Sequence, residues 1–495
     1  MKKHWKFIEK SVVFLCVLCI CVKLVFQLIV PKFFLDNAWP TTSTYLGFYQ
    51  MAENSIDVLC FGSSHAASFF LPQELYNKCG IRSYNLGCEQ QNLITSYFWL
   101  KEALRFQKPK VVLLDCYILF EYRPEEPLNS AESCTRKAFD YMHWSSVKKD
   151  AVKTICKLDE NQSELSYYLP NIRYHTRWKE LSENDFTYAE KSQHYELKGY
   201  APFSHYGRNQ NFVPFECGVS EEKIEMVPLM EEYLEKITQL CAQEDISLIL
   251  IKTPSTYQNI GKHNTIEQYA TEHKLAFLDF NEKAVYEECN YCFAQDNSDD
   301  GHGNLWGAQK VTNYIGKFLI ENYNDICRDD WQWERTKSCY EEIKKDYTLI
   351  YTTDIDTYLT LLQDTRYTIF ISVRDECADA LKDTTLNHLK NLGLEADLKG
   401  KFRYSYLAVL SNGVLTEQLV SEKIEFHASL ENNSLFYTIT SAGFTCGNIS
   451  SIIIDGAEKS KNGRGINIVV YCNDTRKVID SVCFDTHTAE NMAYR

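Results

Sequence analysis

The sequence predicts an α/β protein built on an open, doubly wound parallel sheet, with an N-terminal transmembrane helix and a C-terminal, mostly-β sandwich domain. Over residues 50–325, continuous apolar runs alternate with amphipathic helical segments, a pattern typical of parallel sheets covered by helices on both faces. From residue 346 to the end, β-rich runs surround one clear helix. The length of 495 residues also exceeds that of one ordinary domain.

The N-terminus predicts a membrane anchor over residues 1–35. Four lysines lie within the first ten residues, and the apolar segment Ser11–Val30 that follows is long enough to cross a bilayer. Lys23 and Gln27 interrupt this segment, but a lysine there can extend toward the membrane interface. A cleaved signal peptide is the alternative, although no small-residue cleavage site precedes Pro40. We expect an uncleaved single-pass anchor with a cytoplasmic N-terminus, because the basic flank precedes the span.

Five continuous apolar runs are the predicted strands of the parallel sheet: 56–61, 82–87, 110–120, 246–254 and 275–280. Helix-like segments such as "NLITSYFWLKEALRF" and "VPLMEEYLEKITQLCAQ" separate them. In open sheets of this kind, ligands bind beyond the carboxyl ends of the strands. A functional site is therefore expected at that edge.

Two segments interrupt the alternation of strands and helices. Residues 121–220 lack a strand pattern and are expected to form an insertion, or cap, over the site. Residues 326–345 are charged and helix-like, and we expect them to link the α/β domain to the β-rich domain at 346–495.

Composition and cysteine spacing exclude some classes of function. The formal net charge is −15 and no long basic run occurs, so nucleic acid is not an expected partner. The 19 cysteines are odd in number and show no spacing typical of a disulfide framework. Cys289, Cys292 and His302 could begin a zinc site, but a fourth ligand is not evident. We expect no metal and no cofactor.

Two polar blocks fall at the expected strand ends. Gly62-Ser63-Ser64-His65 follows the first strand, where a turn into a helix exposes a serine beside helical N–H groups. Helix capping is the alternative role of this block. Asp299 and His302 lie three residues apart, just before a predicted helix. His302 can take the serine proton while Asp299, or its neighbour Asp300, orients the ring.

Over residues 56–319 the chain resembles the SGNH/GDSL hydrolases, which have a flavodoxin-like sheet. "GSS" stands in place of the family's Gly-Asp-Ser block, which implies that Ser64 is the nucleophile. "YNLG" resembles the second block and implies an oxyanion-hole role for the Gly87 N–H; "DDGHGNLWG" resembles the Asp-x-x-His block. The third block departs from the family, because "LLDCY" replaces Gly-x-Asn-Asp. The oxyanion asparagine is missing, and we expect Tyr117 or Asn92 to substitute for it.

The resemblance implies a function. Membrane-anchored members similar to this chain act in acylation of cell-surface polymers, often beside a multi-pass membrane acyltransferase. We therefore expect a serine esterase or O-acyltransferase that acts on acyl groups of a cell-surface polysaccharide, with acetyl as the expected acyl group. The alternative is a non-catalytic glycan-binding or scaffold protein with a degenerate hydrolase domain, which the missing asparagine favours.

The C-terminal domain resembles the interleukin-like EMT inducer (ILEI/PANDER) domain, a lectin-like β-sandwich. The resemblance rests on "TIFISVRDE", "GRGINIVVYC" and "VIDSVCFDT", whose order along the chain is changed, as in a circular permutation. The permutation predicts that Phe484–Thr486 lies beside Asp354–Leu362. Carbohydrate binding and a purely structural role are both open for this domain.

Overall fold

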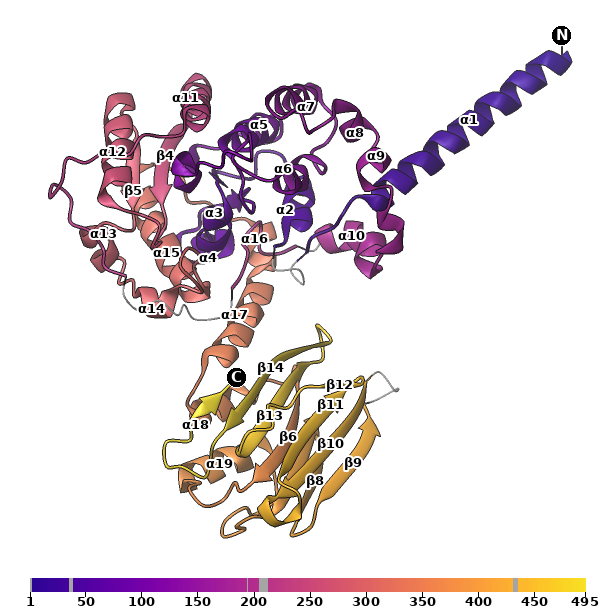
Figure 1. Ribbon diagram of the computed structural model, residues 1–495, viewed down its shortest axis with the longest axis vertical. Helices are drawn as coiled ribbons and strands as arrows, with labels where there is room; N and C mark the ends of the chain where they lie inside the picture. Colours follow the sequence, from indigo (N-terminus) through magenta and orange to yellow (C-terminus); the bar gives the residue numbers. More distant parts are fainter. Residues whose placement is uncertain (1, 35–38, 194, 204–211, 431–434) are drawn as a thin grey trace. The chain divides into compact units, whose positions relative to one another are not determined.

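The computed structural model describes residues 2–34, 39–193, 195–203, 212–430 and 435–495 (Figure 1). The chain divides into two compact units, Met1–Tyr340 and Glu341–Arg495. Part of the expected linker packs onto the first unit. Trp333 and Tyr340 are fully buried there, and Thr336 accepts a hydrogen bond of 2.8 Å from Lys198.

A five-stranded parallel sheet in the order β2-β1-β3-β4-β5 forms the centre of the first unit. Its strands are β1 (Val58–Phe61), β2 (Ser83–Asn85), β3 (Val111–Asp115), β4 (Ser247–Lys252) and β5 (Ala276–Asp279). Each strand lies within a predicted run, and the order is that of flavodoxin-like sheets. The predicted α/β class and parallel sheet are confirmed.

Successive residues of a strand enter two different hydrophobic cores. On β1, Leu59 and Phe61 belong to one core and Val58 and Cys60 to the other. The first core includes α5 (Leu93–Ala103), α11 (Pro228–Gln243) and α12 (Ile260–His273). The second includes α3 (Ser64–Phe69), α4 (Pro72–Cys79), α14 (Phe293–Asp296) and α15 (Leu305–Asn322), with α13 (Lys283–Glu288) at its edge. Because helices cover both faces, the strands are apolar without alternation.

The insertion at 121–220 begins just after the short 3-10 helix η1 (Tyr117–Phe120). Its helices are α6 (Glu132–Phe139), α7 (Ser146–Leu158), α8 (Glu164–Tyr168), α9 (Asn171–Tyr174) and α10 (Glu183–Gln193), with the short turn η2 (Arg177–Lys179). Several of these helices contact α2 (Thr41–Phe48) and α5. The segment that follows them reaches the carboxyl edge of the sheet, where the Ala201 N–H donates to the Ala67 carbonyl at 2.8 Å.

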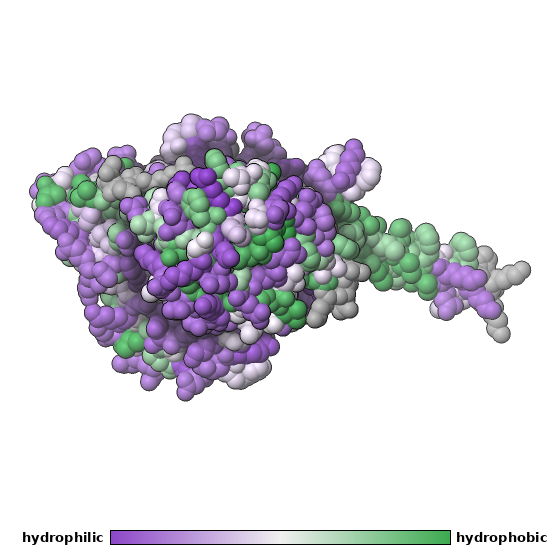
Figure 2. All heavy atoms as spheres, turned by 90° about the horizontal axis from the view of Figure 1, so that it is seen from below, coloured by the Kyte–Doolittle hydropathy of each residue, from purple (hydrophilic) through white to green (hydrophobic). Residues whose placement is uncertain are grey.

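The N-terminal helix α1 (Lys2–Ile29) extends away from the sheet. Among the described residues, Trp5–Ile29 is the one helical stretch long and apolar enough to cross a membrane. Its 25 residues span about 37 Å, more than the ~30 Å hydrocarbon core of a bilayer. Figure 2 shows it as a hydrophobic rod with hydrophilic residues at its far end. The helix fits a membrane anchor or a signal sequence.

An ion-paired cluster fixes the end of α1 to α10. The Lys32 ammonium and the Arg177 guanidinium donate to the backbone carbonyls of residues 27–30. Cations at the last carbonyls of a helix complement its dipole. Asp185 pairs with both, at 2.6 Å from Arg177 Nη2 and 3.6 Å from Lys32 Nζ. Burial lowers the pKa of Lys32 to about 8, although the Asp185 carboxylate opposes that shift.

The second unit is one connected ten-stranded sheet. Its strands are β6 (Tyr367–Asp375), β7 (Ser405–Ser411), β8 (Val414–Val420), β9 (Ile424–Ser429), β10 (Phe436–Gly443), β11 (Ile449–Ile454), β12 (Ala457–Glu458), β13 (Gly465–Cys472), β14 (Lys477–Phe484) and β15 (Ala493–Tyr494). β6 pairs with β7, with β13 and, at its end, with β10, so the sheet branches and curls. The strands thus form one connected, curled sheet, and the sandwich arrangement stays a prediction.

Helices cover one side of this curled sheet. They are α17 (Lys337–Tyr351), which begins within the segment expected to be helix-like, α18 (Ile355–Leu361) and α19 (Asp383–Leu392), the clear helix expected in the β-rich domain. Ile369 and Ile371 of β6 pack with α18 and α19, whereas Phe370 between them packs with β10 and β11. The mostly-β character is confirmed, and alternate residues of β6 fill two separate cores.

The end of the chain lies beside α18. The rings of Tyr358 and Phe484 pack edge to face at 5.2 Å between centroids, and the Tyr358 hydroxyl donates to Asp480 at 3.0 Å. The predicted proximity of Phe484–Thr486 and Asp354–Leu362 is confirmed. The resemblance and the permutation that led to it stay predictions.

Asp185→Ala is expected to destabilise the first unit by about 3–5 kcal/mol, because it leaves two cations without their shared carboxylate. Thermal unfolding of the full chain in detergent measures this loss. Glu190→Ala on the same helix removes an exposed carboxylate and is the matched control. Equal transition temperatures for the two variants would contradict the expectation.

Candidate active site

A sharp turn joins β1 to α3 at the carboxyl edge of the sheet. Gly62 has φ +151°, and a Cβ at this position would lie 2.5 Å from the Cβ of Asp115. Only glycine fits such a close approach to β3. Ser63 then caps α3, since its hydroxyl accepts the His65 N–H at 3.3 Å. Ser64 is the first residue of the helix.

The structure brings Ser64, His302 and Asp299 into one chain of hydrogen bonds. His302 Nε2 lies 2.8 Å from Ser64 Oγ, and His302 Nδ1 lies 2.8 Å from Asp299 Oδ2. Asp299 thus supplies the carboxylate, while the neighbouring Asp300 accepts the Thr256 N–H through its carbonyl. Both members of the pair precede α15, whose first turn is capped by the side chain of Asn304.

The Asp299 carboxylate is held in its ionised form. Partial burial opposes ionisation, but the hydrogen bond and charge of His302 and the N–H groups of Gly301 and His302 lower the pKa of Asp299 to about 2. An ionised Asp299 keeps the proton of His302 on Nδ1. Nε2 is then free to accept the Ser64 hydroxyl proton.

Ser63 has a different partner from Ser64. Its hydroxyl donates to Asp115 Oδ2 at 3.0 Å, at the end of β3. Burial raises the pKa of Asp115 to about 6, although hydrogen bonds from Ser63 and from the Tyr117 N–H act against that shift. Ser63 therefore anchors the turn to the sheet, and its neighbour Ser64 contacts the imidazole.

Three aromatic rings surround His302. Its ring centroid lies 5.6 Å from Trp39, 5.5 Å from Phe203 and 5.5 Å from His65. The sequence blocks predict none of these three contacts. Trp39 and Phe203 lie outside every recognisable block, whereas His65 belongs to the "GSSH" block and was the one open to prediction.

His65 forms a buried wall of the site. Its Nδ1 lies 3.1 Å from the Thr253 hydroxyl, and its ring stacks on Tyr117 with 3.8 Å between centroids. Burial, and then the nearby His302, lower the pKa of His65 well below its ordinary value. A neutral His65 adds no positive charge next to His302.

The predicted oxyanion donors have other partners in this structure. The Gly87 N–H donates to Asn85 Oδ1 at 2.9 Å. The Asn92 side chain caps α5 by accepting the Thr95 N–H at 2.8 Å, and its amide donates to the Leu128 carbonyl at 3.1 Å. The oxyanion roles of Gly87, Asn92 and Tyr117 stay predictions. Because α3 begins at Ser64, its own N–H is among those with no acceptor inside the helix.

No metal site emerges from the described part of the chain. No group of three His, Cys, Asp or Glu residues there is arranged to hold an ion. Both ring nitrogens of His302, the histidine considered with Cys289 and Cys292, face Ser64 and Asp299 instead. The cysteines are free thiols.

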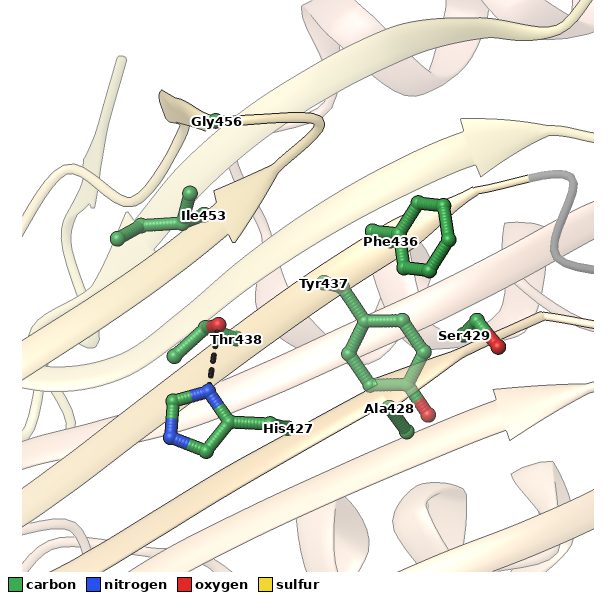
Figure 3. Close-up of a pocket in the computed structure, with 8 residues that line it drawn as sticks. All are labelled: His427, Ala428, Ser429, Phe436, Tyr437, Thr438, Ile453 and Gly456. Atoms are coloured by element: carbon green, nitrogen blue, oxygen red, sulfur yellow. Dashed lines mark hydrogen bonds between the residues drawn. The ribbon is translucent and has the colours of Figure 1, made fainter.

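The second unit has a shallow hollow on its sheet, with a volume of about 470 Å³ (Figure 3). Residues of β9, β10 and β11 line it, and the side chains of His427, Phe436, Tyr437 and Thr438 are drawn there. His427 Nδ1 lies 2.8 Å from the Thr438 hydroxyl. Phe436 is 60% exposed beside them.

Fold and site together define an open α/β protein whose strand ends carry a serine–histidine–aspartate chain of hydrogen bonds. No protein-family model and no curated protein matches the chain. Among solved structures, one similar chain is assigned to the lipolytic G-D-S-L family and comes from Desulfitobacterium hafniense DCB-2. It is 13% identical with a TM-score of 0.28, and the match covers 54% of this chain and 100% of that one.

Asp115→Asn is expected to change how stability depends on pH. The folded pKa of about 6 lies above the ordinary value of 3.8, so the contribution of Asp115 is present below pH 3.8 and is lost as the pH rises through 6. Asparagine cannot ionise. Relative to the natural chain, the variant should gain about 2 kcal/mol of stability between pH 4 and pH 7. Urea unfolding at both pH values measures the difference, and a difference independent of pH would contradict the assignment.

Proposed function

We propose that the first unit is a serine esterase or O-acyltransferase that acts on acyl groups of a cell-surface polysaccharide, with acetyl as the proposed acyl group. The observation that carries this proposal is the continuous hydrogen-bond chain from Ser64 through His302 to Asp299, with distances of 2.8 Å at both links. Nucleophile, base and orienting carboxylate are the parts that acyl transfer through a covalent intermediate needs.

The proposed reaction has two steps. Ser64 Oγ attacks the acyl carbonyl carbon while its proton passes to His302 Nε2; the ester C–O bond breaks, and the leaving alcohol takes that proton. Water or an acceptor hydroxyl then gives its proton to His302 and attacks the acyl-serine carbonyl; the bond between the acyl carbon and Ser64 Oγ breaks, and His302 returns the proton to Ser64 Oγ. Asp299 stabilises the imidazolium at both stages. Hydrolysis and transfer differ only in the acceptor.

The site also supports a second candidate, a non-catalytic glycan-binding or scaffold protein. The observation that favours it is the engagement of the Gly87 N–H and the Asn92 amide by other groups, together with the absence of the expected asparagine after β3. One oxyanion donor contributes about 3–4 kcal/mol to catalysis, so its loss weakens an enzyme considerably.

We propose further that α1 is a retained anchor, with the N-terminus in the cytoplasm and both units outside. The basic residues before the apolar span support this orientation. A cell-surface glycan and a multi-pass membrane acyltransferase are the proposed partners.

Ser64→Ala should abolish labelling by a fluorophosphonate probe and reduce hydrolysis of a small acetyl ester by about 10⁴-fold or more. Ser63→Ala is the matched control, because its hydroxyl contacts Asp115 rather than His302. Mass spectrometry of the labelled chain locates the adduct. Failure of the probe to label the folded natural chain would favour the non-catalytic alternative.

Protease added to intact cells should remove both units, since they are expected outside the membrane. Immunoblotting against an N-terminal tag follows the fragment that remains. Cleavage that requires lysed cells would contradict the orientation.

Phe436→Ala should lower activity on acetylated polysaccharide several-fold while leaving hydrolysis of a small acetyl ester unchanged. The reason is that the hollow of the second unit would hold the polymer and raise its local concentration, without supplying catalytic groups. Phe402→Ala, on another exposed ring of the same unit, is the control. Equal effects on polymer and small ester, or none on polymer, would remove this role.

A further inference from the structure

Large apolar side chains are exposed on the insertion near the end of α1. Trp144, Leu165, Tyr168, Ile172, Trp178 and Phe186 are each between 41% and 66% exposed, and we call these six residues the collar. The helices α9 and α10 contact α1, and Arg177, next to Trp178, donates to the last carbonyls of α1. In Figure 1, α9 and α10 lie at the end of α1 nearest the sheet.

A cavity of about 840 Å³ lies between α1 and the insertion. One stripe of α1 lines it, together with Val30 just after the helix: Leu18, Cys19, Val22, Lys23, Phe26 and Gln27. Their alternating steps of one and three residues place them on one face of the helix. Trp144 and Tyr168 of the collar also line the cavity, with their rings stacked at 4.6 Å. Lys23 and Gln27, the polar residues that interrupt the apolar span, therefore face the cavity.

The depth of this cavity along α1 identifies the medium around it. Leu18 precedes Ile29, the last residue of the helix, by 11 residues, which is a rise of about 16 Å. In a bilayer whose hydrocarbon core is ~30 Å thick, the stripe from Leu18 to Val30 would cover about half of the core. Water is not available at that depth, so lipid is the medium that would meet the open side of the cavity.

The collar also has the composition of a membrane interface. Tryptophan and tyrosine concentrate at the level of the lipid headgroups, and lysines beside them attract phosphate. Lys179 is exposed and lies 5.5 Å from the ring of Trp178. Lys148 lies 4.6 Å from the ring of Trp144 but is buried, and its ammonium donates to the Met142 carbonyl at 2.7 Å. At the other end of the span, Trp5 is also exposed.

We propose that the collar rests in the interfacial layer of the bilayer and that a phospholipid of that leaflet fills the cavity between the collar and α1. This inference rests on the proposed role of α1 as a retained anchor, but it does not depend on chemistry at Ser64. The lipid phosphate would lie near the exposed Lys179, next to Trp178, and its acyl chain would lie along the stripe that starts at Leu18.

Photo-crosslinking of the full chain tests the proposal. The chain carries p-benzoylphenylalanine in place of Trp178 and is inserted into vesicles of phosphatidylethanolamine and phosphatidylglycerol. Its intact mass confirms that α1 is retained. The control places the same probe at Trp331 on α16 (Trp331–Arg335), whose exposed fraction of 71% is similar to the 64% of Trp178. We expect lipid adducts several-fold more often at 178. Equal yields at both positions, or adducts formed in native membranes with protein alone, would overturn the proposal.

Fluorescence quenching by brominated phospholipids provides a second test, with variants that keep an aromatic ring. The chain has eight tryptophans, and the measured quantity is the fraction of their total fluorescence that the lipid quenches. Removing one tryptophan therefore changes this fraction according to whether that residue contacts lipid. Trp178→Phe should lower the quenched fraction, because it removes a tryptophan in contact with lipid, and Trp331→Phe should raise it. A change in the same direction for both variants would overturn the proposal. Ester hydrolysis, measured on the same samples, reports separately on the function proposed for Ser64.

Discussion

The close passage of the chain past Asp115 at Gly62 is the constraint on which the site depends. β1 and β3 are neighbours in the sheet, and a side chain at position 62 would collide with Asp115. Because glycine allows the chain to turn there, α3 starts directly at the sheet edge. The Ser63 hydroxyl is then held by Asp115, and Ser64, one residue further, faces His302. A wider turn would separate the serine from the imidazole.

His302 is positioned by contacts on several sides. Asp299 and two backbone N–H groups organise its own loop, whereas Trp39, Phe203 and His65 pack against its ring from three distant segments. The ring is enclosed by apolar faces but retains its hydrogen bond to Ser64. Such packing limits the rotation of the imidazole and keeps Nε2 directed at the hydroxyl.

Much of the first unit can be predicted from the sequence because its signals are local. Strands that are buried on both faces appear as continuous apolar runs, and the spacing of Ser64, Asp299 and His302 relative to strand ends indicates where they meet. The oxyanion donors cannot be assigned in this way. The Gly87 N–H donates to Asn85, a pairing that depends on how side chains pack. The branching of the second unit's sheet cannot be predicted in this way either, because the pairing of β6 with three other strands is set by contacts between residues far apart in the chain.

The packing of Trp39 against His302 limits the reach of the site. Ten residues separate Ile29, where α1 ends, from Trp39, and a fully extended chain of that length covers at most about 36 Å. If α1 is embedded in a bilayer, the His302 ring therefore lies no further from the lipid surface than this segment can reach. Any group that contacts the Ser64–His302 pair must then enter the same layer, whatever the size of the molecule that carries it.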